Sequence, residues 1–204
     1  MMLSKIIRSV LLLSLCVFPL VGRNIILEFK GAYLLPTSSA FKEIYESGSG
    51  LFGPEVTVQL LDDNQHWYGF ASFDYFHKKG YSTGLSEVTK VSLIPLALGV
   101  KYLKPIRNDK IDLYGGFGFQ AVDVRTKNYS QFVTSKLSQW GFGVITKVGA
   151  FYHLPHNFLL DLFFDYSFAK AGNNGYGCEN INDIASVKAN VSGAIFGIGL
   201  GYNF

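Results

Sequence analysis

The residues that could do acid–base or nucleophilic chemistry are few in this chain, and they lie far apart. Three of its four histidines fall in turn-like sequence: His66, His153 and His156. The fourth, His77, could act as a base for Ser82 or Ser86, but a catalytic triad also needs an acid that orients the histidine, and none is evident. The sequence also lacks the cysteine and histidine spacing of a metal site and the glycine loop of a phosphate site. We therefore expect no enzyme, no cofactor and no metal.

Carboxylates and lysines form a second set of reactive groups, and they alternate with apolar residues. In ILEFKGAY, Glu28 and Lys30 fall on one side of an extended chain, whereas Leu27, Phe29 and Tyr33 fall on the other. This period of two residues is typical of a half-buried strand. The same pattern assigns nine charged residues to the polar faces: Glu28, Lys30, Glu55, Asp74, Lys90, Lys101, Lys147, Asp161 and Asp165. Strands are therefore the elements that must position these charges.

The strand pattern recurs in eight segments: 25–34, 52–61, 66–76, 88–103, 111–124, 138–152, 158–169 and 188–204. Each is long enough to cross a membrane as a tilted strand, which takes about 9–11 residues. The connections alternate in length: long at 35–51, 77–87, 125–137 and 170–187, and short at 62–65, 104–110 and 153–157. Bacterial membrane barrels have short periplasmic turns and longer outer loops. The sequence thus predicts an all-β fold, an eight-stranded antiparallel up-and-down transmembrane β-barrel, monomeric and with both termini in the periplasm.

The faces of the strands could in principle point either way, because a soluble lipocalin-type barrel alternates in the same manner with its apolar face inside. Aromatic residues at the strand ends favour the membrane form, since such residues collect at the membrane interfaces: Tyr33, Trp67, Tyr102, Trp140 and Tyr152. A lysine on the lipid face costs about 2–4 kcal/mol at the midplane, so the charged set is expected inside. In a narrow lumen these charges can pair, and we expect them to fill it rather than to form an ion pathway.

Residues 1–22 have the composition of a secretory signal peptide, in which Lys5 and Arg8 precede an apolar run of about a dozen residues. A spanning helix would need about 20 apolar residues. We expect cleavage after Gly22 and a mature barrel of residues 23–204. Its formal charge falls from +3 to +1, which gives no reason to expect a nucleic-acid partner. Cys178 is then the last thiol, so no internal disulfide is expected.

The chain ends on AIFGIGLGYNF, in which apolar residues alternate with glycines up to Tyr202 and Phe204. This strand resembles the sorting signal of bacterial outer-membrane barrels. Three further stretches, IPLALGVKYL, DLYGGFGFQAV and GFGVITKVGAFYHLPHNFLLDLFFDYSF, resemble consecutive hairpins of the small OmpA/OmpX/OmpW-type barrels. The resemblance covers almost the whole mature chain and implies a bacterial outer-membrane location. It also implies contact with outer-membrane lipid, periplasmic chaperones and the insertion machinery, but no wall-binding domain after Phe204.

The outer loops hold most of the sequence that a barrel does not need, and loops carry binding. The loops 35–51 and 170–187 contain aromatic residues that we expect to be exposed for contacts: Phe41, Tyr45 and Tyr176. We therefore predict a structural and surface-interaction role, adhesin-like, toward a host-cell or matrix surface. The alternative is a narrow pore or conduit for small apolar molecules, which the OmpW-like members of the resembling group suggest. A lipid-modifying enzyme is the third and weakest hypothesis.

Overall fold

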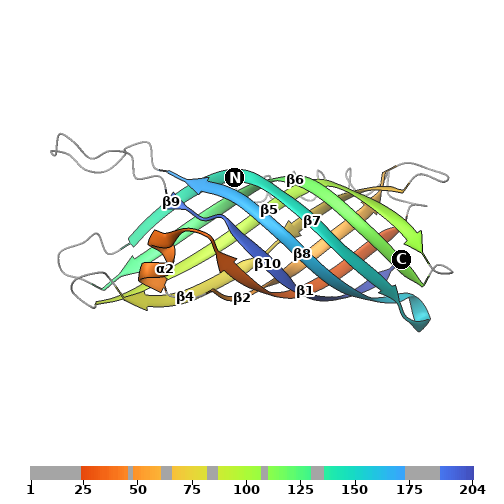
Figure 1. Ribbon diagram of the computed structural model, residues 1–204, viewed down its shortest axis with the longest axis horizontal. Helices are drawn as coiled ribbons and strands as arrows, with labels where there is room; N and C mark the ends of the chain where they lie inside the picture. Colours follow the sequence, from red (N-terminus) through yellow and green to blue (C-terminus); the bar gives the residue numbers. More distant parts are fainter. Residues whose placement is uncertain are drawn as a thin grey trace, which may run out of the picture.

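The computed structural model describes residues 24–45, 48–60, 66–81, 87–106, 110–129, 136–172 and 189–204. Antiparallel strands in one sheet make up most of the fold: β1 (Ile25–Pro36), β2 (Ser49–Gln59), β3 (Trp67–Phe73), β4 (Tyr75–Tyr81), β5 (Val88–Ile106), β6 (Ile111–Asn128), β7 (Lys136–His153), β8 (Phe158–Ala171), β9 (Ala189–Asn190) and β10 (Gly193–Asn203). Two short helices accompany them, α2 (Ser39–Tyr45) and the 3-10 turn η2 (Pro155–Asn157). The strands run obliquely along the long axis of the molecule (Figure 1).

The sheet closes on itself, because β1 pairs with both β2 and β10. Strands β3 and β4 are two parts of one barrel strand, since β2 and β5 each pair with both. They separate at Asp74, whose backbone N–H donates to the carbonyl of Pro95 at 3.0 Å. Pro95 has no N–H to donate in return, so the ladder is interrupted there. The ring therefore has eight strands, as the sequence predicts.

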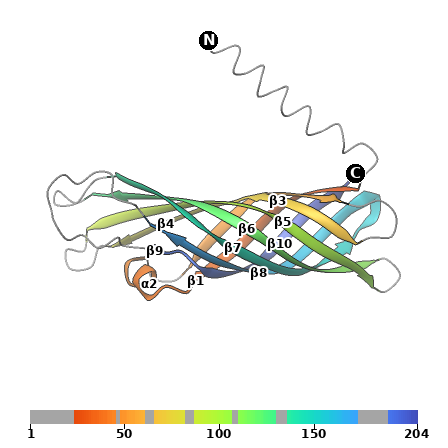
Figure 2. The same ribbon diagram turned by 90° about the horizontal axis from the view of Figure 1, so that it is seen from above.

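The two ends of the barrel differ. Helix α2 and strand β9 lie at one end, and the C-terminal Phe204 lies at the other (Figures 1 and 2). The backbone N–H of Phe204 donates to the carbonyl of Ile25 at 2.9 Å, so the first and last strands also end together. We call the end with α2 the outer end, because the longer connections of membrane barrels face outward. Neither helix in the described ranges has the length and hydropathy to span a bilayer.

Apolar side chains cover the outside of the wall, and the inside holds a mixed core. On β10, Phe196, Ile198 and Leu200 are exposed while the alternate positions are inward. The same holds on β1, where Glu28 and Lys30 are buried and Phe29 between them is 60% exposed. Proteins in water rarely expose so large a continuous apolar surface. This wall therefore faces lipid. The predicted membrane orientation is confirmed.

Several predicted boundaries were too short. The third strand continues as β4 to Tyr81, the fourth reaches Ile106 and the fifth reaches Asn128, because long barrel strands project beyond the membrane. The predicted loop 35–51 contains α2, which period-two analysis could not find, and its last three residues already belong to β2. The expected signal peptide, residues 1–22, lies outside the described residues.

Candidate functional site

Seven charged side chains from five strands meet inside the barrel: Glu28, Lys30, Glu55, Lys101, Lys147, Asp161 and Asp165. Each is at most 4% exposed. All seven were expected on the inner face, because strand alternation alone determines the side from which each one projects. We call these seven residues the lumen network.

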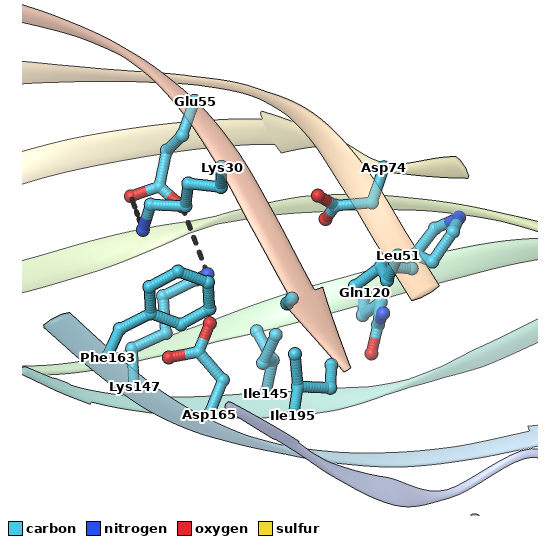
Figure 3. A pocket seen from close by; sticks show the side chains of 12 residues that line it. Lys30, Leu51, Glu55, Asp74, Gln120, Ile145, Lys147, Phe163, Asp165 and Ile195 are labelled. Carbon is cyan, nitrogen blue, oxygen red and sulfur yellow. Dashed lines mark hydrogen bonds and ion pairs between the residues drawn. The ribbon is translucent and has the colours of Figure 1, made fainter. Parts of the chain in front are cut away.

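Glu55 is the centre of the lumen network, because all three lysines pair with it. Its carboxylate lies 3.2 Å from Lys30 and 3.0 Å from Lys147, and it also accepts a hydrogen bond from Lys101. The dashed lines in Figure 3 show the first two of these pairs. A buried ion costs several kcal/mol unless it is paired. One carboxylate cannot balance three ammonium groups, so the three lysines need further acids nearby.

Those acids come from β1 and β8. Lys30 also lies 3.2 Å from Asp161 and 3.6 Å from Glu28, and the ammonium group of Lys147 lies 2.7 Å from Asp165. The sequence did not single out Tyr114, whose hydroxyl donates to Asp161 at 3.0 Å. The ammonium group of Lys101 lies 4.5 Å from the centre of the same tyrosine ring. Strand parity would have placed Tyr114 inside, but nothing in its neighbours marks it as a partner of Asp161.

Glycines of β10 make room for the lumen network, because this strand lies between β1 and β8. A Cβ atom on Gly199 would lie 3.2 Å from Cβ of Asp161 and 3.3 Å from Cγ of Lys30. A Cβ atom on Gly201 would lie only 2.5 Å from a methyl carbon of Leu159. Gly199 and Gly201 thus project inward, and the absence of a side chain there leaves room for the long charged side chains of a narrow lumen.

Apolar layers close the lumen on both sides of this network. Toward the inner end lie buried side chains of several strands: Ile26, Leu103, Phe151 and Leu159. Toward the outer end lies a second group: Leu34, Leu51, Phe76, Val91 and Leu93. Ion pairs are stronger in a low-dielectric core than in water. The network is therefore a buried layer of the core, with an apolar layer on each side.

Asp74 lies beside the lumen network but does not join it. Its carboxylate lines a cavity of about 10 Å³ together with Lys147 and Asp165, and Figure 3 shows it apart from the paired groups. No ion pair within 4.0 Å links Asp74 to a lysine that the structure describes. A cavity of this size holds about one water molecule.

Helix α2 packs beside β4 onto the outer apolar layer, and this corrects the expected exposure of its aromatics. Tyr45 is buried at 6% exposure, and its hydroxyl shares a 3.4 Å hydrogen bond with Thr89. Phe41 is half-buried, with its ring centre 4.8 Å from Tyr45 and 6.3 Å from Phe76. Both rings pack downward onto the apolar layer because the helix folds back over it. The third expected contact residue, Tyr176, lies outside the described residues, as does Cys178.

Lys90 is a second correction. It was expected in the lumen, but Thr89 and Val91 are the buried residues at this point of β5, and Lys90 projects outward. Its ammonium group donates to the hydroxyl of Tyr129 at 3.2 Å. In one strand, residues 90 and 101 are separated by an odd number of positions, so Lys90 cannot share the inner face with Lys101.

The C-terminal residues lie at the inner rim of the wall. Phe204 is 67% exposed, and its ring centre lies 4.8 Å from that of Tyr202, which in turn contacts Phe158 at 5.3 Å. Trp67 and Tyr102 form a similar exposed pair at 5.3 Å. Such a group of aromatics suits the membrane interface. The sorting role of Tyr202 and Phe204 stays a prediction.

The histidines make local hydrogen bonds. Nδ1 of His77 lies 3.0 Å from the hydroxyl of Ser92, and Nε2 of His153 lies 2.8 Å from Asp112 at the inner end. The proposed partners of His77, Ser82 and Ser86, lie outside the described residues. Among the residues that the structure does describe, no group of three His, Cys, Asp or Glu side chains is arranged to hold a metal ion.

No protein-family model and no curated protein matches the chain. Solved structures do. Ail, the attachment invasion locus protein of Yersinia pestis, was solved with the heparin analogue sucrose octasulfate; it is 14% identical over 89% of this chain and 99% of its own, with a TM-score of 0.54. The chain has the fold of a small outer-membrane β-barrel. Outer membrane protein W of E. coli has this fold as well; it is 16% identical over 89% of this chain and 98% of its own, with a TM-score of 0.54. A major outer membrane protein of Thermus thermophilus also has it, with 14% identity over 90% of this chain and 100% of its own and a TM-score of 0.52.

These similarities agree with the apolar outer wall and with the predicted outer-membrane location. The resemblance to small OmpA/OmpX/OmpW-type barrels that the hairpins indicated is confirmed at the level of the fold. At these identities the similarity extends to the barrel and not to any particular ligand.

Proposed function

We propose that this outer-membrane barrel is a monomeric surface-interaction protein that acts through its outer end and not through its lumen. One observation carries the proposal: the lumen is filled by a buried, ion-paired network between two apolar layers. The cavity beside that network holds about one water molecule. The same proposal assigns the chain no catalytic step and no cofactor.

The outer end also has material that barrel closure does not require. A hairpin closes with about two to five residues, whereas β1 and β2 are joined through α2. The buried face of α2 packs onto the outer apolar layer, and its other face presents Lys42 and Glu43 to solvent. The residues between β8 and β9 form a second long connection, which lies outside the described residues. Connections of this kind commonly carry binding.

The similarity to Ail supports the same direction. That neighbour is an attachment invasion locus protein by name, and it was solved with a heparin analogue. By analogy we propose host-cell or matrix glycan as the first partner class to test. Contact with the insertion machinery and with periplasmic chaperones during assembly is part of the proposal, since every barrel of this type must be inserted.

Binding tests this proposal directly. The parent barrel, displayed on bacteria, should increase adherence to epithelial cells or to immobilised matrix. A variant in which residues 174–187 are replaced by a short Gly/Ser turn should keep the barrel folded and lose adherence. A matched control, Lys104→Ser with Lys110→Ser, changes exposed residues of the inner end and should adhere like the parent. Equal adherence of all three proteins would contradict the proposal.

Conductance separates this function from the alternative of a pore or conduit. Purified, refolded parent protein in a planar bilayer should give no stable conductance in the porin range, because the lumen is filled. Stable channels, or uptake of small apolar solutes into liposomes by a parent protein that binds no surface, would replace the surface-interaction proposal with the conduit.

A further inference from the structure

Three neighbouring strands bring lysines into one row on the outer wall. Lys79 of β4 stands opposite Lys90 of β5, which stands opposite Lys127 of β6. Directly opposed residues share a face of the sheet, with Cβ atoms about 4.5–5.5 Å apart. All three point outward; Lys79 and Lys127 are exposed and Lys90 is half-exposed. We call these three residues the lysine row.

The position of the lysine row relative to lipid follows from the rows below it. Two rows toward the inner end come Ile94, Asp123 and Trp140, of which Trp140 is 52% exposed. Beyond these come fully lipid-facing side chains such as Phe119 and Phe142, at 73% and 72% exposure. A tryptophan marks the interface of a membrane. The lysine row lies about 13 Å further along the tilted strands, four residues at about 3.3 Å each, on the outer side of the headgroup layer that Trp140 marks.

The row between them consists of polar residues that satisfy one another. His77, Ser92, Arg125 and Ser138 stand in register across four strands. His77 bonds to Ser92 at 3.0 Å, and Arg125 pairs with Asp123 through Nε at 2.8 Å and Nη2 at 2.7 Å. Ser138 donates to the same carboxylate at 3.2 Å. Arg125 of this polar row thus has its carboxylate partner, Asp123, within the protein.

The lysine row has no such acid. Within the described ranges, no carboxylate lies within 4.0 Å of Lys79, Lys90 or Lys127; Lys90 contacts Tyr129 instead, with its ammonium group 5.0 Å from the ring centre. The hydrogen bond from Lys90 and the positive charges of Lys90, Lys127 and Lys79 lower the pKa of the exposed Tyr129 hydroxyl. Like charges directly opposite each other destabilise a sheet, so the row is suited to an external anion.

We propose that the lysine row binds phosphate groups of a phosphorylated lipid in the outer leaflet. The side chains point away from the wall at headgroup level, where the phosphates of a lipid lie. A soluble ligand that approaches along the barrel axis would reach the outer loops before it reached these lysines. Lysine binds phosphate as a point charge, without the fixed geometry that arginine would impose. Three lysines in line can hold one headgroup between neighbouring strands, so the barrel recruits a lipid to the side formed by β4, β5 and β6.

Lipid A tests the inference, with the parent barrel refolded in phosphatidylcholine nanodiscs. Fluorescent bisphosphorylated lipid A is titrated into the nanodiscs, and the same lipid without phosphates serves as the second probe. The triple variant K79Q/K90Q/K127Q should bind bisphosphorylated lipid A about 100-fold more weakly, since each lysine near an anionic surface contributes about a factor of five. The variant K42Q/K104Q/K110Q removes the same charge from exposed positions outside the row and should bind like the parent.

Removal of the phosphates should weaken binding to the parent and leave the triple variant unchanged. If K79Q/K90Q/K127Q does not fold, the single variant K90Q replaces it, with an expected loss of about fivefold. Equal binding of lipid A by the parent and the lysine variant overturns the inference. It is also overturned if the lysine variant loses binding to soluble heparin while it keeps binding to lipid A, because the row would then be a glycan site.

Discussion

Lys147 on β7 and Glu55 on β2 form a 3.0 Å ion pair across the lumen, although their strands share no backbone hydrogen bonds. Lys30 and Asp161 make a second contact, at 3.2 Å, between β1 and β8, which lie on either side of β10. The backbone ladder joins only neighbouring strands, whereas Lys147 and Glu55 join walls that face each other, and Lys30 and Asp161 bridge over one strand. The lumen network therefore links strands that the backbone ladder does not join. Its removal should lower the free energy of unfolding even where the ladder stays intact.

Replacement of one cation in the lumen network tests this. Lys147→Met removes the charge and keeps much of the apolar stem, so Glu55 and Asp165 lose a shared partner. We expect the free energy of unfolding to fall by about 3–5 kcal/mol, the usual cost of breaking a buried pair. Urea unfolding in detergent, followed by the heat-dependent shift on SDS gels, measures it. Lys104→Met at an exposed position should change stability by less than about 0.5 kcal/mol.

The glycines of β10 beside the network give a second prediction. Gly201→Ala would bring a methyl group within 2.5 Å of Leu159, so the core must shift, and overpacking of this kind costs about 1–3 kcal/mol. Gly31→Ala is the matched control, because nothing lies within 4 Å of the added Cβ. That variant should be as stable as the parent or slightly more so, by about 0.4–1 kcal/mol. Equal losses in both variants would show that the room beside Gly201 does not matter.

Strand periodicity was sufficient to predict the ring of eight strands and the seven buried charges. Alternation fixes the face of every residue once one face is assigned, so Glu28, Lys101 and Asp161 could be placed without coordinates. Periodicity does not tell which side chains pair across the lumen. That depends on the stagger between strands, which brings Tyr114 to Asp161 and leaves Asp74 without a lysine among the described residues.

The outer end was harder to predict for two physical reasons. Helix α2 has only seven residues, too few for a clear helical period, and it is held by packing onto Phe76 rather than by its own propensity. The alignment of Lys79, Lys90 and Lys127 depends on the register of three strands, and register is invisible in the sequence of any one of them. Lys90 was placed on the wrong face because its parity was not counted from Lys101.

The burial of Tyr45 leads to a prediction about the mouth of the barrel. Tyr45→Ala should destabilise the protein by about 3 kcal/mol, because it leaves a cavity above Phe76 and removes the hydrogen bond to Thr89. Lys42→Ala on the exposed side of the same helix should be nearly neutral. Protease cleavage within α2 should likewise be faster in Tyr45→Ala than in Lys42→Ala or the parent. A neutral Tyr45→Ala would mean that α2 does not pack onto the apolar layer in solution.

The last strand leads to a prediction about assembly. Tyr202 and Phe204 lie at the inner rim, on the lipid side and in ring contact with each other, and Tyr202 also contacts Phe158. These positions lie outside the lumen network, so the folded barrel should lose little stability when both are changed to serine. Recognition by the insertion machinery should suffer more, because it depends on the terminal aromatic and the apolar alternation. We expect Tyr202→Ser with Phe204→Ser to reduce the amount of heat-modifiable barrel in the membrane and to leave protease-sensitive chain in the periplasm.

Leu200→Ile keeps an apolar residue in the same strand and serves as the control. If the serine variant refolds in detergent like the parent and also reaches the membrane in equal yield, the terminal residues are not a sorting signal; if it fails in both settings, they act on folding itself.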